Sequence, residues 1–275
     1  MSTMRSRTGG VTDLSDGELL AMTRNLDEMH RDLFPRFRLA VAEMAEGWRV
    51  RAESDRAISR MAATRRTFLR GGLAATGAVG GAAVLAACGG SSAPATGGSA
   101  STGTPAAEPV DLTVARLAAS LEALAVGTYQ TVLDAAGKGA LGTVPPSIAT
   151  FVTTAKAQHA DHQNAWNAAL RSAGRPVQTA PDPHYKKVVD AALPNVKTVG
   201  DAAKLALTLE TVAVETYTAG SAMVTDNAHR LVALPNAPVE AQHAAILHYV
   251  LGQYPVPDAF IKTDMAASPR DLSES

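Results

Sequence analysis

Two residue pairs in the C-terminal half of the sequence place imidazole and carboxylate groups at helical spacing. Glu240 and His243 lie three residues apart in VEAQHAAILHYVLG, and His159 and His162 lie three apart in QHADHQNAW. Residues three apart on a helix are neighbours on one face, so each pair could bring two ligand atoms to one metal ion. Glu-x-x-His alone is a weak signal, because chance produces it in many helices. Support must come from other parts of the chain.

An internal repeat supplies that support. LEALAVGTYQ (121–130) and LETVAVETYT (209–218) share six identical positions, among them Glu and Tyr in register. Alanine-rich helices match by chance, but a matched Glu and Tyr at fixed spacing are much harder to obtain that way. Gln-His-Ala at 158–160 also echoes Gln-His-Ala at 242–244. The repeat predicts a duplicated helical hairpin and a bundle with approximate two-fold symmetry.

The repeat singles out Glu122 and Glu210, each of which lies within an apolar stripe of its helix. A carboxylate that faces a core is costly unless it is paired, protonated or bound to a cation. Tyr129 and Tyr217 lie seven residues further on, about 10 Å along the helix axis. We expect them to line the same interior without being metal ligands. One Glu from each of two helices, with Glu-x-x-His from the other two, is the ligand plan of carboxylate-bridged dimetal sites in four-helix bundles.

Composition and turn residues predict the elements that must position these side chains. Alanine is abundant and aromatic residues make up only 4%, which favours an all-α class. A net charge of -1 gives no indication of nucleic-acid binding. Long helices are predicted from Asp111 as N-cap to about 136, from about 145 to 174, over 198–224, and around 239–252, with a short helix at 184–193. The proline-interrupted tail is expected to lie over the bundle as an extended strap.

Residues 111 to about 252 resemble the ferritin-like superfamily, in particular the small ferritin-like domains of bacterial exported proteins. Glu122, Glu210, Glu240 and His243 carry the resemblance. It implies an antiparallel four-helix bundle, here with a short extra helix between helices 2 and 3. It also implies a di-iron or di-manganese centre and oxidase, peroxidase or iron-handling chemistry.

The second helix departs from the family pattern. If His162 is taken as the family histidine, His159 occupies the place of a bridging glutamate; if the Gln-His-Ala echo is used instead, Lys156 falls there. The first alignment is preferred, because Trp166 and Leu170 then face the bundle interior. Glu215 does not replace the missing carboxylate, because it points about 140° away from Glu210 and is expected on a solvated or inter-helix face.

This departure changes the charge of the expected site. Four glutamates offset the charge of two divalent ions, whereas three glutamates with three neutral histidines leave one excess positive charge. A single ion or an asymmetric pair therefore becomes plausible, and the extra imidazole favours Zn, Cu or Fe over Mg or Ca. The alternative is a metal-free polar core in which the same residues hydrogen-bond one another. His184, His229 and His248 are expected at the surface.

Upstream of the bundle, the chain resembles a bacterial export signal. Arg65 and Arg66 precede an uncharged run at 71–87, and Leu85-Ala86-Ala87-Cys88 resembles a lipobox, so the sequence is similar to a twin-arginine lipoprotein signal. Cys88 is the only cysteine, which excludes an internal disulfide. The competing interpretation is a short membrane-spanning or buried helix with an ordinary cysteine.

Four segments are therefore expected: 1–60, 61–88 (the signal), 89–110 (a flexible Gly/Ser/Pro tether), and 111–275 (the bundle with its strap). Residues 1–60 are either a cytoplasmic helical extension that is lost when the signal is cleaved, or the product of a misassigned start, with Met61 as the natural beginning. Ser15 and Glu18 have capping-box spacing, which favours a helix. Its expected apolar stripe is Leu19, Met22, Leu26, Met29 and Leu33.

The sequence thus predicts a protein lipid-anchored through Cys88 at the outer face of the bacterial cytoplasmic membrane. Its bundle would bind one or two transition-metal ions, with iron as the leading candidate, and could carry out oxidase or peroxidase chemistry. The candidate ligands are Glu122, His159, His162, Glu210, Glu240 and His243. The alternative is a non-catalytic surface lipoprotein whose metal-free bundle is an interaction module. Homo-oligomerisation stays open, and no sequence feature names a substrate or a protein partner.

Overall fold

A computed structural model describes residues 15–72, 108–225, 227, 230 and 235–273, and the side chains of 65–72 are not described. All regular structure in these residues is helical, which confirms the all-α prediction. The helices are α1 (Asp16–Gly72), α2 (Val110–Gly137), α3 (Pro146–Ser172), α4 (Pro183–Ala192), α5 (Val199–Met223) and α7 (Asn236–Val250), with short 3-10 helices η2 (Leu193–Asn195) and η3 (Asp271–Ser273).

The chain divides into two compact units, and α1 contributes to both. One unit contains the chain up to Arg49 together with Pro109–Ser275, and the other contains Val50–Glu108. The predicted border at residue 61 therefore falls within a continuous helix. The domain borders themselves stay predictions.

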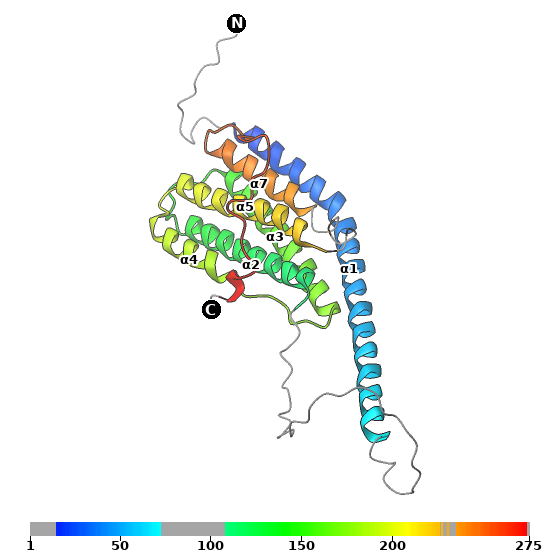
Figure 1. The fold of residues 1–275 in the computed structure, drawn as a ribbon. Coiled ribbons are helices and arrows are strands. Elements are labelled where there is room, and N and C mark those ends of the chain that lie inside the picture. Colours follow the sequence, from blue (N-terminus) through cyan, green and yellow to red (C-terminus); the bar gives the residue numbers. More distant parts are fainter. Residues whose placement is uncertain (1–14, 73–107, 226, 228–229, 231–234, 274–275) are drawn as a thin grey trace, which may run out of the picture. The chain divides into compact units, whose positions relative to one another are not determined.

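The first unit contains the expected four-helix bundle of α2, α3, α5 and α7 (Figure 1). Helix α2 packs along α3, α5 packs along α7, and α2 also contacts α5. Local signals set the helix ends. Thr198 and Asp201 form a complete capping box at the start of α5. Gly174 and Gly252 adopt positive φ after α3 and α7, a conformation that glycine takes without a Cβ clash.

The first part of α1 packs on this bundle as a fifth helix. Leu19 and Leu26 share a hydrophobic cluster with Phe151 and Leu247, and Trp48 belongs to a second cluster with Trp166. The expected apolar stripe was partly wrong, because Met29 and Leu33 are 44% and 59% exposed. The buried face is instead formed by Leu19, Thr23, Leu26, His30, Phe37, Val41, Met44, Ala45 and Trp48. This face continues to Trp48, about four turns beyond the predicted stripe.

One predicted cap was also wrong. Helix α2 begins at Val110 with Pro109 as its N-cap, so Asp111 lies inside the first turn. Its buried carboxylate instead accepts hydrogen bonds from the Thr225 backbone N–H at 3.0 Å and from the Thr225 hydroxyl at 3.1 Å. Asp111 therefore ties the start of α2 to the residues that follow α5. The other helix ends differ from the prediction by only a few residues.

Within its described residues, the C-terminal tail crosses the bundle without regular structure except η3. Ala267 packs against Leu117 of α2 and Val212 of α5. Glu215 is buried rather than solvated, because its Oε2 accepts a hydrogen bond from the Met265 backbone N–H at 2.5 Å. Glu215 thus holds the tail to the bundle and takes no part in the polar core.

Of the predicted export signal, only residues 61–72 are among the described residues. The backbone of residues 65–72 is part of α1, whereas residues 73–87 of the uncharged run, Cys88 and residues 89–107 of the tether lie outside the described residues. Residues 108–110 of the predicted tether are described, and Val110 begins α2. Within the described part of the chain, no helix is both long enough and apolar enough to cross a membrane. The signal, the lipid anchor and the location at the membrane stay predictions.

Candidate metal centre

The structure brings all six predicted ligands together in the core of the bundle. Glu122 comes from α2, His159 and His162 from α3, Glu210 from α5, and Glu240 and His243 from α7. Each is at most 2% exposed. Their ligand atoms fall into two groups whose members lie within 4.8 Å of one another: Glu122, His159, His162 and Glu240; and His159, Glu210, Glu240 and His243. Whether they bind metal stays a prediction.

The Glu240 carboxylate joins the two groups. Its Oε1 lies 3.3 Å from His162 Nδ1, and its Oε2 lies 3.3 Å from His243 Nδ1. One carboxylate oxygen therefore faces each group, as a bridging ligand requires. Glu122 and Glu210 then contribute one terminal carboxylate to each side, with His162 Nδ1 3.4 Å from Glu122 Oε1 and His243 Nδ1 3.4 Å from Glu210 Oε2.

His159 occupies the position opposite Glu240, where the sequence predicted a missing bridging carboxylate. Its Nδ1 lies 2.7 Å from Glu122 Oε2, and its Nε2 lies 3.1 Å from Glu210 Oε1. The ring therefore presents one nitrogen to each group. The rival alignment fails, because Lys156 is outside the core and donates to Gln130 Oε1 at 2.7 Å.

Five buried polar atoms of this cluster suit a cation. His162 Nδ1, His243 Nδ1, Glu210 Oε2 and both Glu240 carboxylate oxygens make no hydrogen bond within the described structure. They approach one another at 3.3 to 3.4 Å without hydrogen-bond geometry. A buried polar atom without a partner costs about 1–3 kcal/mol. A metal ion would satisfy several such atoms at once, because all of them converge on the same two places.

The two tyrosines of the repeat hold the terminal carboxylates crosswise. Tyr129 donates to Glu210 Oε1, and Tyr217 donates to Glu122 Oε1. Trp166 Nε1 in turn donates to the Tyr217 hydroxyl at 3.0 Å. Each tyrosine therefore orients the glutamate of the other repeat, which the spacing within one helix could not reveal.

The outer nitrogens of the two terminal histidines also have partners. Gln158 Oε1 lies 2.9 Å from His243 Nε2, and His30 Nε2 lies 3.3 Å from His162 Nε2. Sequence reasoning assigned no role to Gln158 or His30. The only available signal for His30 was its place between Leu26 and Phe37, on what proves to be the buried face of α1.

Comparison with protein families agrees with this arrangement. A model described as a ferritin-like domain matches residues 110–253, just over half of the 275 residues. The chain belongs to the ferritin-like domain family. The match runs from the start of α2 to just past the end of α7, and leaves α1 outside it. Searches of the curated proteins and of the solved structures found no match.

Charge pairing dominates the electrostatics of the ferritin-like core. Burial opposes the shift, but the carboxylates of Glu122 and Glu240 raise the pKa of His162 to about 9. Glu210 and Glu240 likewise outweigh burial and raise the pKa of His159 well above 6.5. Burial also opposes the shift at Glu122, yet His162 and His159 lower its pKa to about 2. Cations are thus strongly favoured among these carboxylates, whether protons on imidazole or a metal.

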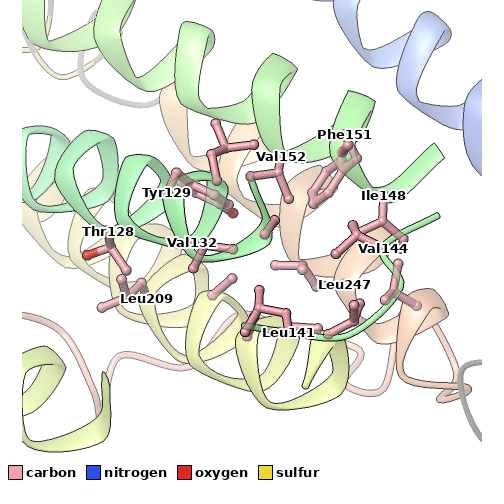
Figure 2. A pocket seen from close by; sticks show the side chains of 18 residues that line it. Thr128, Tyr129, Val132, Leu141, Val144, Ile148, Phe151, Val152, Leu209 and Leu247 are labelled. Carbon is pink, nitrogen blue, oxygen red and sulfur yellow. The ribbon is translucent and has the colours of Figure 1, made fainter. Parts of the chain in front are cut away.

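Several cavities adjoin the ferritin-like core. One cavity has a volume of about 50 Å³. Apolar side chains such as Phe151 and Leu247 line it, with Tyr129 on its wall (Figure 2). A second cavity of about 400 Å³ lies between α1 and the start of α7, where its lining includes His30, His162 and Gln242. This second cavity adjoins the buried cluster on its His162 side.

His184 and His248 lie outside the cluster. His248 is half-buried on α7, with Nδ1 2.6 Å from Gln253 Oε1, so it has a partner that the sequence did not reveal. The rings of His184 and Tyr185 meet edge to face at a centroid distance of 5.0 Å. His229 lies outside the described residues.

Proposed function

We propose that the protein is an exported, lipid-anchored ferritin-like protein whose bundle binds one or two transition-metal ions, with iron as the main candidate. The family and the buried His/Glu groups support metal binding. The observation that carries it is the set of five buried ligand atoms without hydrogen bonds, which converge on two places in the core. A site made of three carboxylates and three imidazoles suits iron better than Mg or Ca.

Iron held by these residues would supply redox chemistry, passing electrons from an external reductant to dioxygen or peroxide. The chain's own residues would hold that ion and keep water away from it. Tyr129 and Tyr217 fix one oxygen of each terminal glutamate, so the other oxygen keeps its direction. The cluster is almost fully buried, which strengthens charge interactions within it. We therefore propose oxidase or peroxidase-type activity at this site.

The second candidate function is a metal-free bundle that acts as an interaction module. The contacts of His159 support this metal-free bundle, because both ring nitrogens of His159 lie within hydrogen-bond distance of a carboxylate, at 2.7 and 3.1 Å. A doubly protonated ring there would join Glu122 to Glu210 and brace three helices. The two candidates differ in what neutralises the carboxylates, so metal content separates them.

The deciding experiment measures iron bound to the purified full-length chain after anaerobic reconstitution. The chain carries Cys88→Ser, so that no acyl group is attached. We expect Glu240→Gln to lower bound iron at least about tenfold, because it removes the carboxylate shared by both groups. Glu215→Gln is the matched control, since it changes a buried glutamate outside the cluster.

Each result has a defined meaning. A wild-type chain without transition metal after reconstitution would rule out metal binding and the enzymatic function together, and would leave the metal-free module. Equal iron in wild type and Glu240→Gln would place the metal elsewhere. If iron is bound, hydrogen peroxide consumption by the loaded wild type, against Glu240→Gln, tests the catalytic proposal.

Export and anchoring rest on the Arg65–Arg66 pair and on the residues that end at Cys88. We expect Arg65→Lys with Arg66→Lys to retain the protein in the cytoplasm. Cys88→Ser should release the exported protein from the membrane fraction. Fractionation of bacterial cells with an antibody to the bundle measures both, and unchanged membrane attachment in both variants would contradict this part of the proposal.

A further inference from the structure

Helix α1 is fixed to the bundle along its first 33 residues, Asp16–Trp48. Its apolar side chains enter two clusters: one with α3 and α7 residues such as Phe151 and Leu247, the other with α3 residues such as Trp166. At the start of α1, the Ser147 hydroxyl donates to Asp16 Oδ1, and the Tyr249 hydroxyl donates to Glu18 Oε2 at 2.6 Å. Both apolar and polar contacts thus set the position of this helix.

His30 is the polar residue of α1 that reaches the cluster. It is only 7% exposed, and its ring stacks on Phe34 at a centroid distance of 4.9 Å. Its Nε2 lies 3.3 Å from His162 Nε2, on the side of the His162 ring opposite Glu122 and Glu240. His162 would bind metal through Nδ1, so its Nε2 carries the ring proton, and His30 Nε2 can accept that hydrogen bond.

Gln158 makes the corresponding contact on the other side. Its Oε1 lies 2.9 Å from His243 Nε2, while His243 Nδ1 faces Glu210 and Glu240. A partner on the outer nitrogen of a metal-binding histidine fixes both the tautomer and the ring orientation. Both terminal histidines therefore have a partner on the outer nitrogen. One partner comes from the family bundle, and the other comes from α1, which lies outside the family match.

We propose that His30 is a positioning residue for His162, so that residues 16–49 of α1 form a fifth wall of the metal centre. The inference rests on the proposed metal binding. It assigns His30 to the group of Glu122, His159, His162 and Glu240, and Gln158 to the group that contains His243. Loss of His30 should therefore weaken one metal position and leave the other unchanged.

Cobalt(II) titration of the full-length Cys88→Ser chain tests this assignment, because cobalt absorption bands report the ligands directly. We expect His30→Phe, which keeps a ring but removes the acceptor, to weaken the His162 position about 10–100-fold. His30→Gln should restore most of that affinity, because it offers the same type of acceptor that Gln158 offers. His248→Phe, a histidine change outside the cluster, should match wild type.

The reciprocal variant is Gln158→Leu. It should weaken the His243 position by a similar factor and leave the bands of the His162 position unchanged. Equal cobalt spectra and affinities for His30→Phe and wild type would overturn the proposal. So would a loss in His30→Phe that His30→Gln does not recover, because a packing role alone would then account for it.

A metal-independent measurement separates this inference from the proposed function. The ¹⁵N shifts of histidine-labelled, metal-free chain report the protonation and hydrogen bonding of each ring nitrogen. His30→Phe should change the His162 shifts, and His248→Phe should not. A wild-type chain that binds no cobalt defeats the proposed function, while a changed shift at His162 Nε2 still supports positioning by His30; unchanged shifts defeat the positioning role itself.

Discussion

The two halves of the polar core present the same ligand types but are built from different parts of the chain. On the His243 side, the ligands, Tyr129 and Gln158 all come from the bundle that the family model matches. On the His162 side, Tyr217 comes from that bundle, whereas His30 comes from α1. Both sides thus take their inner ligands from the bundle, and the His162 side is also contacted by α1, which lies outside the family match.

The largest expected effect is the loss of one metal position. His162→Ala should abolish the position on its side and His243→Ala the other, because each removes the terminal imidazole of one group. Each variant should keep one cobalt-binding position with its own absorption bands. Complete loss of cobalt binding in either variant would mean that the two halves are not separable.

A carboxylate at position 159 should raise the metal affinity of both halves of the core and make the two affinities more equal. His159→Glu would supply the fourth carboxylate of the family plan and offset the excess positive charge of two divalent ions. We expect the second ion to bind at least about tenfold more tightly, because a full charge within about 4 Å of an ion is worth several kcal/mol in a protein interior. Competition titration with a chelator measures this. Weaker binding of the second ion would show that the imidazole itself is the better bridge.

Truncation in the core of α1 should affect the His162 side selectively. Leu26 is 2% exposed and lies one turn before His30. Leu26→Ala should lower the free energy of unfolding by about 2–5 kcal/mol or undock α1 locally, and it should weaken only the His162 position. Leu247→Ala is the matched control, with the same exposure and the same cluster. Thermal unfolding and cobalt titration measure both effects. If Leu26→Ala and Leu247→Ala weaken the His162 position equally, α1 does not support that position selectively.

The smallest expected effects come from the tyrosines. Tyr217→Phe removes the donor to Glu122, and Tyr129→Phe removes the donor to Glu210. A hydrogen bond to a charged group contributes about 1.5–3 kcal/mol, so each variant should lower the affinity of its own side by one to two orders of magnitude. Isothermal titration with cobalt would show this. A tyrosine that affects the opposite side would contradict the crosswise pairing.

The sequence was sufficient for the four helices and for the residues that meet between them. Glu122 and Glu210 could be found because a repeat placed two carboxylates in apolar stripes, and His159 because it broke an otherwise regular ligand plan. Their association in one buried cluster follows from helical periodicity, which the chain obeys closely.

The contacts between helices could not be read in the same way. His30 was missed because Met22, Met29 and Leu33 suggested a different face of α1, and periodicity cannot choose between two overlapping apolar stripes. The crosswise tyrosines depend on which helices are neighbours and on their relative shift. These are properties of packing, and spacing within one helix does not encode them.

The position of His30 ahead of Cys88 in the chain has a consequence for maturation. If the signal is cleaved before Cys88, as the resemblance to a lipobox implies, His30 and His162 belong to two separate polypeptides afterwards. An intramolecular contact then becomes a bimolecular one, and its effective concentration falls from that of a tethered partner to that of a released peptide. The precursor and the mature protein would hold the same ion with different affinity, so cleavage would be an irreversible step that loosens the His162 side.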